Sequence, residues 1–367
     1  MKTEFKFPFY AKVSFVFIGL FAFISMLFIA QGIIVPIIYS TIIAIVLSPM
    51  VDYFTKKKVN RIVAISLTLV LVIFTTIFFI ALLSKQMMQL SDSFPKLIEK
   101  FHQVMDQSVI WISGNFNISQ EKVNIWIADK NSEILKATNS LVSETIINTG
   151  GVLIVLVLIP VYIFMILYYQ PLLLEFVHKV FKASIQAEVN EVLTATKKII
   201  KSYLVGLLLE AVIMATLNSL SLLIIGIDYA ILLGVIGAIL NVIPYIGGII
   251  AVILPMMIAL ATKPSFSYCL LVLAVYITTQ FIDNHYIKPK IVASKVKINA
   301  LISVVVVLAG GALWGIPGMF LSIPLIAIVK VILDHIEPLK PWGYLLGDTM
   351  PTEVTGKKHL KIKVINN

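Results

Sequence analysis

Six stretches of this chain carry no charged residue, and each is long enough to cross or enter a lipid bilayer. They are residues 13–51, 62–84, 145–174, 229–262, 264–282 and 298–329. About 20 apolar residues in a helix span the hydrocarbon core, so the longest stretches hold more than one span. Only 13% of the residues are charged, about half of the share in soluble domains. The sequence therefore predicts an all-α polytopic membrane protein embedded in a lipid bilayer.

The positions of lysine and arginine predict its orientation, because these residues concentrate in cytoplasmic loops. Three lysines precede the first stretch, and Lys56, Lys57, Lys58 and Arg61 follow the second span. Both termini are then cytoplasmic. The single spans predicted in this way are residues 13–30, 33–49, 62–84, 147–169, 202–227 and 267–286. The runs 229–262 and 298–335 must each begin and end on the same side, on opposite faces of the membrane.

Both of these runs are interrupted by helix breakers. The first contains NVIPYIGG at residues 241–248, and the second contains Gly310, Gly311 and Gly315-Ile316-Pro317. Each half of the first run has about 15 residues and would reach about 22 Å as a helix, less than the roughly 30 Å of the hydrocarbon core. We therefore expect eight hydrophobic segments, of which two pairs form broken, re-entrant or tilted hairpins of opposite orientation.

The charge pattern also predicts the organisation of the chain. Residues 85–144 read as an extracytoplasmic helical hairpin, with Pro95 interrupting or starting its first helix and a turn at residues 113–115. Residues 171–201 read as a cytoplasmic amphipathic helix. The predicted units are three spans (1–84), the insert (85–144), the fourth span (145–170), the amphipathic helix (171–201), a transport core (202–335) with its two broken hairpins (229–262 and 298–335), and a basic cytoplasmic tail (336–367).

The breaks are the candidate binding region. Irregular backbone at membrane depth is tolerated only where protein or a water-filled cavity satisfies its polar groups, and paired broken segments point to the binding site of a transporter. A kinked but purely structural helix pair is the alternative. The candidate substrate-binding residues are Asn241, Pro244, Tyr245, Gly247, Gly248, Asn218 and Gln280, and the candidate hinge or hairpin-break residues are Pro289, Gly310, Gly311 and Pro317.

Three polar residues are candidates for coupling to an ion or proton. Glu210 lies well inside a predicted span, where a charge is costly, so it reads either as a proton or cation site or as a neutral acid bonded to a neighbouring helix. Asp283 and Asn284 end the sixth span within QFIDNHYIKPK, residues 280–290. They read either as part of the same site or, for Asp283, as the partner of a nearby lysine at the interface.

Several classes of function have no support in the sequence. The common hydrolase, metalloprotease, P-loop and dinucleotide-binding motifs are absent, so we expect neither an enzyme nor a cofactor. The five histidines are scattered and the single cysteine, Cys269, lies in an apolar run, so we expect no metal site. The net charge of +10 reflects cytoplasmic loops and does not indicate nucleic-acid binding.

Three segments together resemble the autoinducer-2 exporter family of bacterial membrane proteins. They are IGIDYAILLGVIGAILNVIPYIGGIIAVILP (225–255), QFIDNHYIKPKIVASKVKINALI (280–302) and GGALWGIPGMFLSIPLIAIVKVI (310–332). The resemblance implies a homo-oligomeric permease of the bacterial inner membrane with an elevator-like, alternating-access movement. Asn241, Pro244, Tyr245, Gly247, Asp283, Asn284 and Pro289 fall on the family pattern, whereas Glu210 matches no part of it.

Three functions follow as hypotheses. The leading one is a secondary transporter that exports a small polar solute, for which the resemblance offers the quorum-sensing signal autoinducer-2. The second is Na⁺/H⁺ antiport through Glu210 or Asp283. The third is a non-transporting membrane scaffold that acts through residues 85–144.

Overall fold

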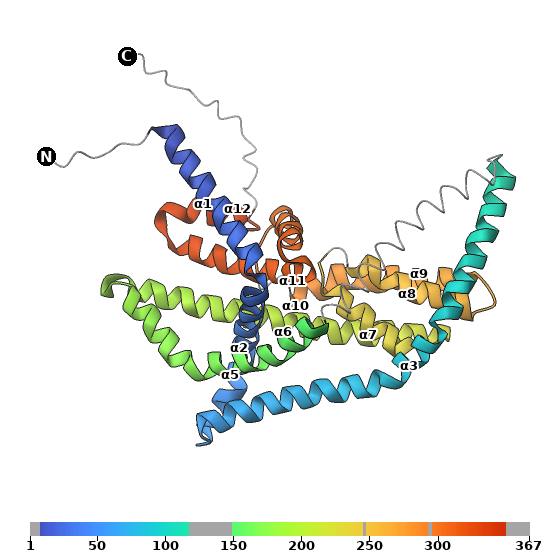
Figure 1. The fold of residues 1–367 in the computed structure, drawn as a ribbon, viewed down its shortest axis with the longest axis horizontal. Helices are drawn as coiled ribbons and strands as arrows, with labels where there is room; N and C mark the ends of the chain where they lie inside the picture. The colour runs from blue at the N-terminus through green and yellow to red at the C-terminus, as the bar shows by residue number, and fades with distance from the viewer. Residues whose placement is uncertain (1–7, 117–148, 245–246, 293–295, 350–367) are drawn as a thin grey trace, which may run out of the picture.

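The computed structural model describes residues 8–116, 149–244, 247–292 and 296–349, and this part of the chain is almost entirely helical (Figure 1). A single β-bridge joins Ile298 to Gly347. The main helices are α1 (Phe9–Ile29), α2 (Gln31–Lys56), α3 (Arg61–Phe116), α5 (Thr149–Val180), α6 (Gln186–Ile225), α7 (Ala230–Asn241), α8 (Gly247–Thr262), α9 (Ser267–Ile282), α10 (Lys288–Ile291), α11 (Ala300–His335) and α12 (Lys340–Leu346). Short turns η1 (Ala183–Ile185), η2 (Asp283–Ile287) and η4 (Glu337–Leu339) link some of them.

Six helical stretches within the described residues are long and apolar enough to cross a membrane. They are Phe9–Ile29, Gln31–Lys56, Arg61–Ser93, Val157–Val180, Ala183–Ile225 and Ala300–His335. Helices α7 and α8 are apolar but shorter. The predicted all-α, multi-pass architecture is thus confirmed, whereas the count of eight membrane segments and the re-entrant hairpins stay predictions.

Helix α6 holds the molecule together. It packs against α7, α9, α10 and α11, and also against α2. The long helix α3 runs along the lower side of Figure 1 and contacts α2 and α5 as well as α7 and α8. Gly226, in the left-handed conformation at φ 79°, ends α6 and lets the chain turn back into α7.

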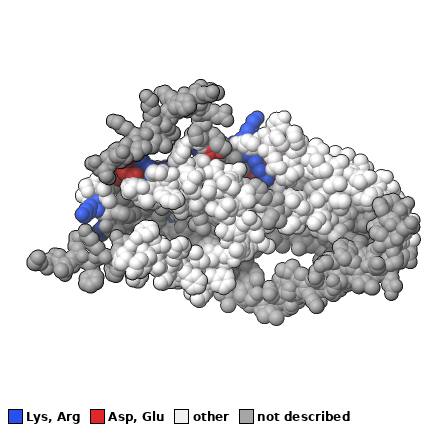
Figure 2. All heavy atoms as spheres, turned by 90° about the horizontal axis from the view of Figure 1, so that it is seen from above, with Lys and Arg blue, Asp and Glu red and all other residues white. Residues whose placement is uncertain are grey.

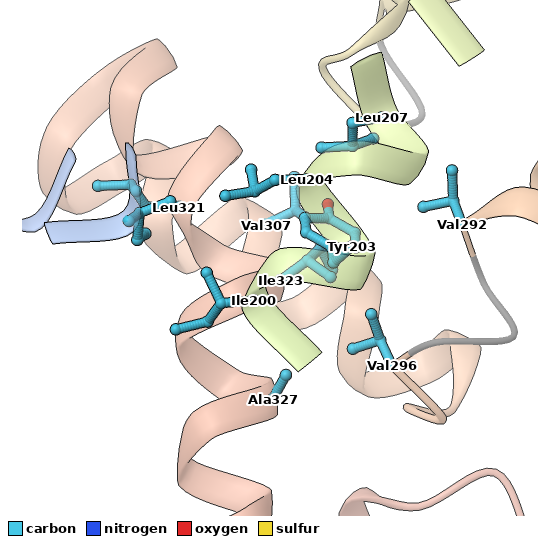
Figure 3. Close-up of a cluster of buried hydrophobic side chains, with 11 residues drawn as sticks. Ile200, Tyr203, Leu204, Leu207, Val292, Val296, Val307, Leu321, Ile323 and Ala327 are labelled. Atoms are coloured by element: carbon cyan, nitrogen blue, oxygen red, sulfur yellow. The ribbon is translucent and has the colours of Figure 1, made fainter. Parts of the chain in front are cut away.

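The buried apolar side chains form three separate clusters. One lies mainly between α6 and α11, and Figure 3 shows Ile200, Leu204 and Leu207 of α6 near Val307 and Leu321 of α11. A second joins the end of α6 to α7, α8 and α9. The third joins α2, α3 and α5. Lipid is as apolar as these side chains, so the close packing of the helices, rather than escape from water, holds these clusters together within a bilayer.

Much of the apolar surface faces outward. In the most apolar part of α1, no residue is buried inside the molecule. Figure 2 shows a broad uncharged surface on the right of the view, and the visible charged side chains lie at the left and in the centre of the view. Such a surface suits contact with lipid, since the hydrocarbon core accepts apolar side chains and excludes charges.

In two of the predicted soluble segments, the described residues differ from the prediction at one point each. Helix α3 continues from the third span through Pro95 to Phe116, so Pro95 neither interrupts nor starts a helix. Residues 117–148, which hold the remainder of the predicted insert, lie outside the described residues, as does the predicted tail from residue 350. Residues 171–201 are divided between the end of α5 and the start of α6. The intervening turn is closed by bonds from Gln186 Nε2 to the His178 carbonyl oxygen (3.2 Å) and between His178 Nε2 and Asn190 Oδ1 (2.8 Å).

Both glycine- and proline-interrupted runs reverse direction at their breakers. Helix α7 ends at Asn241 and α8 begins at Gly247. Only glycine fits at position 247, because a Cβ there would lie 1.8 Å from the Leu240 carbonyl oxygen. A Cβ on Gly310 would lie 2.1 Å from Ser322 Oγ. Residues twelve positions apart would be about 18 Å apart in a straight helix, so α11 consists of two arms. They meet at Trp314 and Gly315, whose backbone angles are not helical.

Candidate functional site

A buried cluster of charged and amide side chains lies where four elements meet. Glu210 comes from α6, Asn241 is the last residue of α7, Asp283 opens η2 and Lys288 opens α10. Asn241 Nδ2 donates to Asp283 Oδ2 at 2.8 Å and to Glu210 Oε1 at 3.3 Å. Gln280 Nε2 of α9 donates to Asn241 Oδ1 at 3.2 Å. The last residue of α7 therefore carries an amide that links two carboxylates from different elements.

One lysine serves both carboxylates. Lys288 Nζ lies 2.8 Å from Asp283 Oδ2 and 3.6 Å from Glu210 Oε1. Asp283 is 0% exposed and Glu210 is 2% exposed. Glu210 Oε2 and Asp283 Oδ1 are buried without a hydrogen-bond partner. Because a buried charge is costly unless it is paired and hydrogen-bonded, each of these two oxygens would gain from a further cation or donor group.

A wide helical turn places Lys288 in the cluster. Residues Asp283–Ile287 form the π-helical turn η2, in which the Lys288 backbone N–H donates to the Asp283 carbonyl oxygen. Pro289 has no N–H, and its ring conflicts with the carbonyl four residues earlier, so a regular α-helix is unfavourable here. The wider turn brings the Lys288 and Asp283 side chains together, and π-helical turns are frequent at functional sites.

Glycines let the surrounding backbones approach closely enough to build the cluster. A Cβ on Gly206 of α6 would lie 2.6 Å from the Ile291 carbonyl oxygen, so this glycine seats α10 against α6. A Cβ on Gly248 would lie 2.6 Å from Gln280 Oε1. Gly206 therefore fixes the position of the segment that carries Lys288, and Gly248 makes room for the amide that holds Asn241.

A cavity of about 250 Å³ adjoins the cluster. Glu210, Asn241, Pro244 and Lys288 form its polar side. Its apolar side is shared with the buried cluster of Figure 3, and the remaining lining residues are Tyr203, Leu207, Val242, Val292, Val296, Ile298, Ser303 and Ile323. A concave space with a few convergent polar groups on an otherwise apolar wall is the usual form of a small-molecule site.

The structure brings together residues that the sequence placed in separate groups. Asn241, Gln280, Glu210 and Asp283 form one hydrogen-bonded cluster, and Pro244 lines the same cavity. Glu210, which matches no part of the family pattern, is thus linked to residues that do. Asp283 pairs with a lysine and is fully buried while doing so, and its part in ion coupling stays a prediction.

Other predicted site residues lie elsewhere. Asn284 is exposed. Asn218 is buried on α6, two turns beyond Glu210. The candidate hinge residues Gly310, Gly311 and Pro317 lie at the reversal of α11, whereas Pro289 follows Lys288 directly. Tyr245 lies outside the described residues.

Lys288 is not among the site residues predicted from the sequence. A signal was present, because Lys288 follows Asp283 by five residues and precedes a proline. Among the residues that the structure describes, no group of three or more His, Cys, Asp or Glu side chains could hold a metal ion. The ionic centre of the site is therefore built on two acids and one lysine.

Comparison with known proteins links this chain to a family. Residues 15–337 match the model of the family described as AI-2E family transporter. The chain is 26% identical over 324 residues to the AI-2 transport protein TqsA of Escherichia coli, covering 87% of this chain and 90% of that protein. It is 24% identical over 337 residues to the putative transport protein YueF of Bacillus subtilis, covering 89% of each. A shorter match, 33% over 133 residues, links it to the putative transport protein YrrI of the same organism and covers 36% of this chain.

Proposed function

We propose that this chain, which belongs to the AI-2E family of transporters, moves a small polar solute across the membrane through the cavity beside Asn241. The observation that carries the proposal is that Glu210, Lys288 and Asn241 line that cavity. Lys288 and Asn241 also bind the buried Asp283 behind them. Ionisable groups inside a membrane protein are expensive and usually mark a substrate or ion pathway. The family match favours transport over the hypothesis of a non-transporting scaffold.

The solute that we propose is exported and carries polar groups, and autoinducer-2 is the first candidate. Its support is the name of the TqsA relative, which is an AI-2 transport protein. The cluster offers an amide, two carboxylates and an ammonium, which can bind hydroxyl or carbonyl groups of a small molecule. We place the protein in the bacterial inner membrane as a homo-oligomer with both termini in the cytoplasm.

The mechanism that we propose is alternating access with an elevator-like movement. Asn241 and Pro244 border the cavity at the first reversal, and Ile323 of α11 lines it from the second broken run. Paired broken segments around a site are the arrangement from which many secondary transporters work.

Flux in proteoliposomes tests this function. Labelled autoinducer-2 would be offered with and without imposed proton and sodium gradients. The intact protein would be compared with Asn241→Ala, which removes the amide shared by both carboxylates, and with Asn190→Ala as a matched control, since Asn190 bonds only to the distant His178 among the contacts shown. Saturable flux that Asn241→Ala loses and Asn190→Ala keeps supports the proposal. Flux that Asn241→Ala keeps unchanged contradicts a site at this cluster.

Na⁺/H⁺ antiport is the second candidate, and one observation favours it specifically. Two buried carboxylates share a single ammonium, and each keeps one oxygen without a partner. A sodium ion or a proton would balance the remaining negative charge. Glu210→Gln and Asp283→Asn should then abolish sodium-dependent changes of internal pH in the same vesicles. If either variant retains this exchange, the acid that it replaces is not the coupling group.

A further inference from the structure

Three lysines border a groove beside the contact between α6 and α10. The groove has a volume of about 530 Å³, and its basic side chains are Lys198 and Lys201 of α6 and Lys290 of α10. Among the described residues that line it, none is an acid. It shares no lining residue with the cavity beside Asn241. The groove is therefore a positively charged site separate from that cavity.

The charges of this groove face solvent or lipid headgroups. Lys198, Lys201 and Lys290 are all exposed. Within the part of the chain that the structure describes, neither Lys198 nor Lys201 forms an ion pair with a carboxylate. A cleft lined by charges of one sign raises the local concentration of counter-ions, so this groove attracts anions.

The other half of the groove is apolar. Val205 and Leu209 lie on the same face of α6 as Lys201, at intervals of one helical turn, and both are exposed. Ile291 adds an apolar side chain from α10. Leu209 follows Lys201 by eight residues, which corresponds to a rise of about 12 Å along the helix. The lining of the groove therefore changes from positive to apolar along α6.

This change matches the depth of one leaflet of a bilayer. The headgroup layer on each side of the hydrocarbon core is about 5–8 Å thick, so a groove with its lysines among the headgroups has Leu209 at the level of the acyl chains. Lys201 directly precedes the predicted span 202–227, and the charge pattern predicts that this end of the span is cytoplasmic. The same leaflet then supplies both the anionic groups and the acyl chains that the groove fits.

We propose that this groove binds an anionic phospholipid of the cytoplasmic leaflet, with its phosphate among the three lysines and its acyl chains along Val205 and Leu209. A lysine ammonium forms strong, charge-assisted hydrogen bonds to phosphate oxygens. Basic pockets between membrane helices on the cytoplasmic side are known binding sites for acidic headgroups. A soluble phosphate would use only the lysines, whereas a phospholipid uses both halves of the groove.

The lipid site adjoins the segment that carries Lys288. Lys290 follows Lys288 by two residues, and Gly206, which also lines the groove, seats α10 against α6. A phosphate bound to lysines of both elements therefore joins α6 to α10 at the contact that positions Lys288. Binding of the lipid does not depend on the proposed transport function and can be tested without it.

Lipid binding to the purified protein tests the site directly. Native mass spectrometry would measure the Kd of phosphatidylglycerol and that of phosphatidylcholine with the same acyl chains, whose headgroup has no net charge. We expect phosphatidylglycerol to bind about tenfold more tightly, because each lysine attracts a net negative headgroup. Equal affinity for the two lipids would overturn an anionic site.

Replacing the lysines tests whether this groove is the site. In Lys198→Gln/Lys201→Gln/Lys290→Gln the Kd of phosphatidylglycerol should rise by about tenfold, to about that of phosphatidylcholine, because the attraction to the phosphate is lost. All three lysines are exposed, so the variant should fold like the intact protein. An unchanged Kd in this variant would overturn the proposal.

A matched variant controls for the loss of net charge. Lys56→Gln/Lys58→Gln/Lys182→Gln removes the same number of charges at exposed positions that do not line the groove. All three positions lie in segments that are predicted to be cytoplasmic, and this variant should keep the Kd of the intact protein. An equal rise of the Kd in both triple variants would mean that the lipid responds to net charge and not to this groove.

Two further measurements distinguish a lipid from a soluble anion. Glycerol 3-phosphate carries the phosphate without acyl chains, so even a large excess should not displace phosphatidylglycerol, and full displacement would mean a soluble-phosphate site. Phosphatidylglycerol with a photoreactive acyl chain should label the intact protein around Val205 and Leu209. Labelling confined to other helices would overturn the proposal, and this result needs no variant to fold.

Discussion

At the residue scale, the arrangement of charges around Lys288 decides what the site can do. The lysine contacts two carboxylates, and only 28% of its side chain is exposed. A buried ion pair contributes little net stability compared with apolar residues of the same volume. Removing one partner, however, leaves the other as an unpaired buried charge. Lys288 therefore acts as a built-in counter-ion whose loss should affect the fold as well as transport.

Replacing this lysine should destabilise the protein strongly. In Lys288→Met both Asp283 and Glu210 lose their cation, and we expect the free energy of unfolding to fall by about 3–5 kcal/mol. Thermal unfolding in detergent would measure the loss, with Lys201→Met at an exposed position of α6 as the control. The double variant Lys288→Met/Asp283→Asn should recover much of the loss, because it removes the nearer stranded charge. A single variant as stable as the intact protein would mean that the ion pairs do not form as described.

At the element scale, close approaches at glycines fix how the helices meet. Gly206 seats α10 on α6, Gly247 closes the reversal before α8, and Gly310 closes the reversal within α11. Inside a bilayer, small residues at contacts do the work that apolar burial does in water, because they let backbones pack closely. The site depends on these approaches, since Lys288 and Asn241 both sit next to them.

Displacing α10 from α6 should impair the site more than the fold. A Cβ on Gly206 would lie 2.6 Å from the Ile291 carbonyl oxygen, so Gly206→Ala must push the segment bearing Lys288 away from Glu210. We expect solute flux in proteoliposomes to fall by about tenfold or more, since small misplacements at a site are costly. Ser202→Ala, one turn earlier on the same helix, should leave flux unchanged. Equal flux in both variants would show that the α6–α10 contact does not position the site.

The reversal of α11 can be tested through stability. In Gly310→Ala the methyl group would meet Ser322 Oγ at 2.1 Å and the Gly318 carbonyl oxygen at 2.5 Å. Forcing atoms into a packed contact typically costs about 1–3 kcal/mol, so we expect a lower unfolding temperature in detergent. Gly32→Ala is the control, because nothing lies within 4 Å of its Cβ. An unchanged unfolding temperature would contradict the close approach of the two arms.

The helices could be predicted from the sequence more readily than the contacts between them. Long uncharged runs predicted membrane helices because a bilayer imposes a minimum length. Asn241 stood out as a polar residue within such a run, and Asp283 as the acid that directly follows another. The turn between α5 and α6 was not predicted, because no glycine or proline lies between residues 172 and 205 to mark it. Lys288 was missed because its role depends on its contacts with Glu210 of α6 and Asp283 of η2, which no local pattern shows.

At the scale of the whole molecule, contacts join segments that the charge pattern assigns to the same side of the membrane. Arg61 donates to the Leu167 carbonyl oxygen at 2.7 Å, and both lie near predicted cytoplasmic ends. Lys263 Nζ lies 3.7 Å from Asp228 Oδ2, and both lie in predicted external loops. This agreement makes the predicted orientation a definite target for experiment.

Cysteine labelling should then reveal two groups of positions. The single native cysteine, Cys269, is buried and can be removed as Cys269→Ala. In that background, single cysteines at the exposed positions Asp228 and Ser265 should react with a membrane-impermeant maleimide in intact cells, whereas those at Lys57 and Lys182 should react only in inverted vesicles. The reason is that clusters of Lys and Arg remain in the cytoplasm during insertion. The reverse pattern would place the termini outside. A mixed pattern within either pair would contradict the arrangement of spans, because the first pair flanks the α7–α8 run and the second pair flanks the helices α3 and α5.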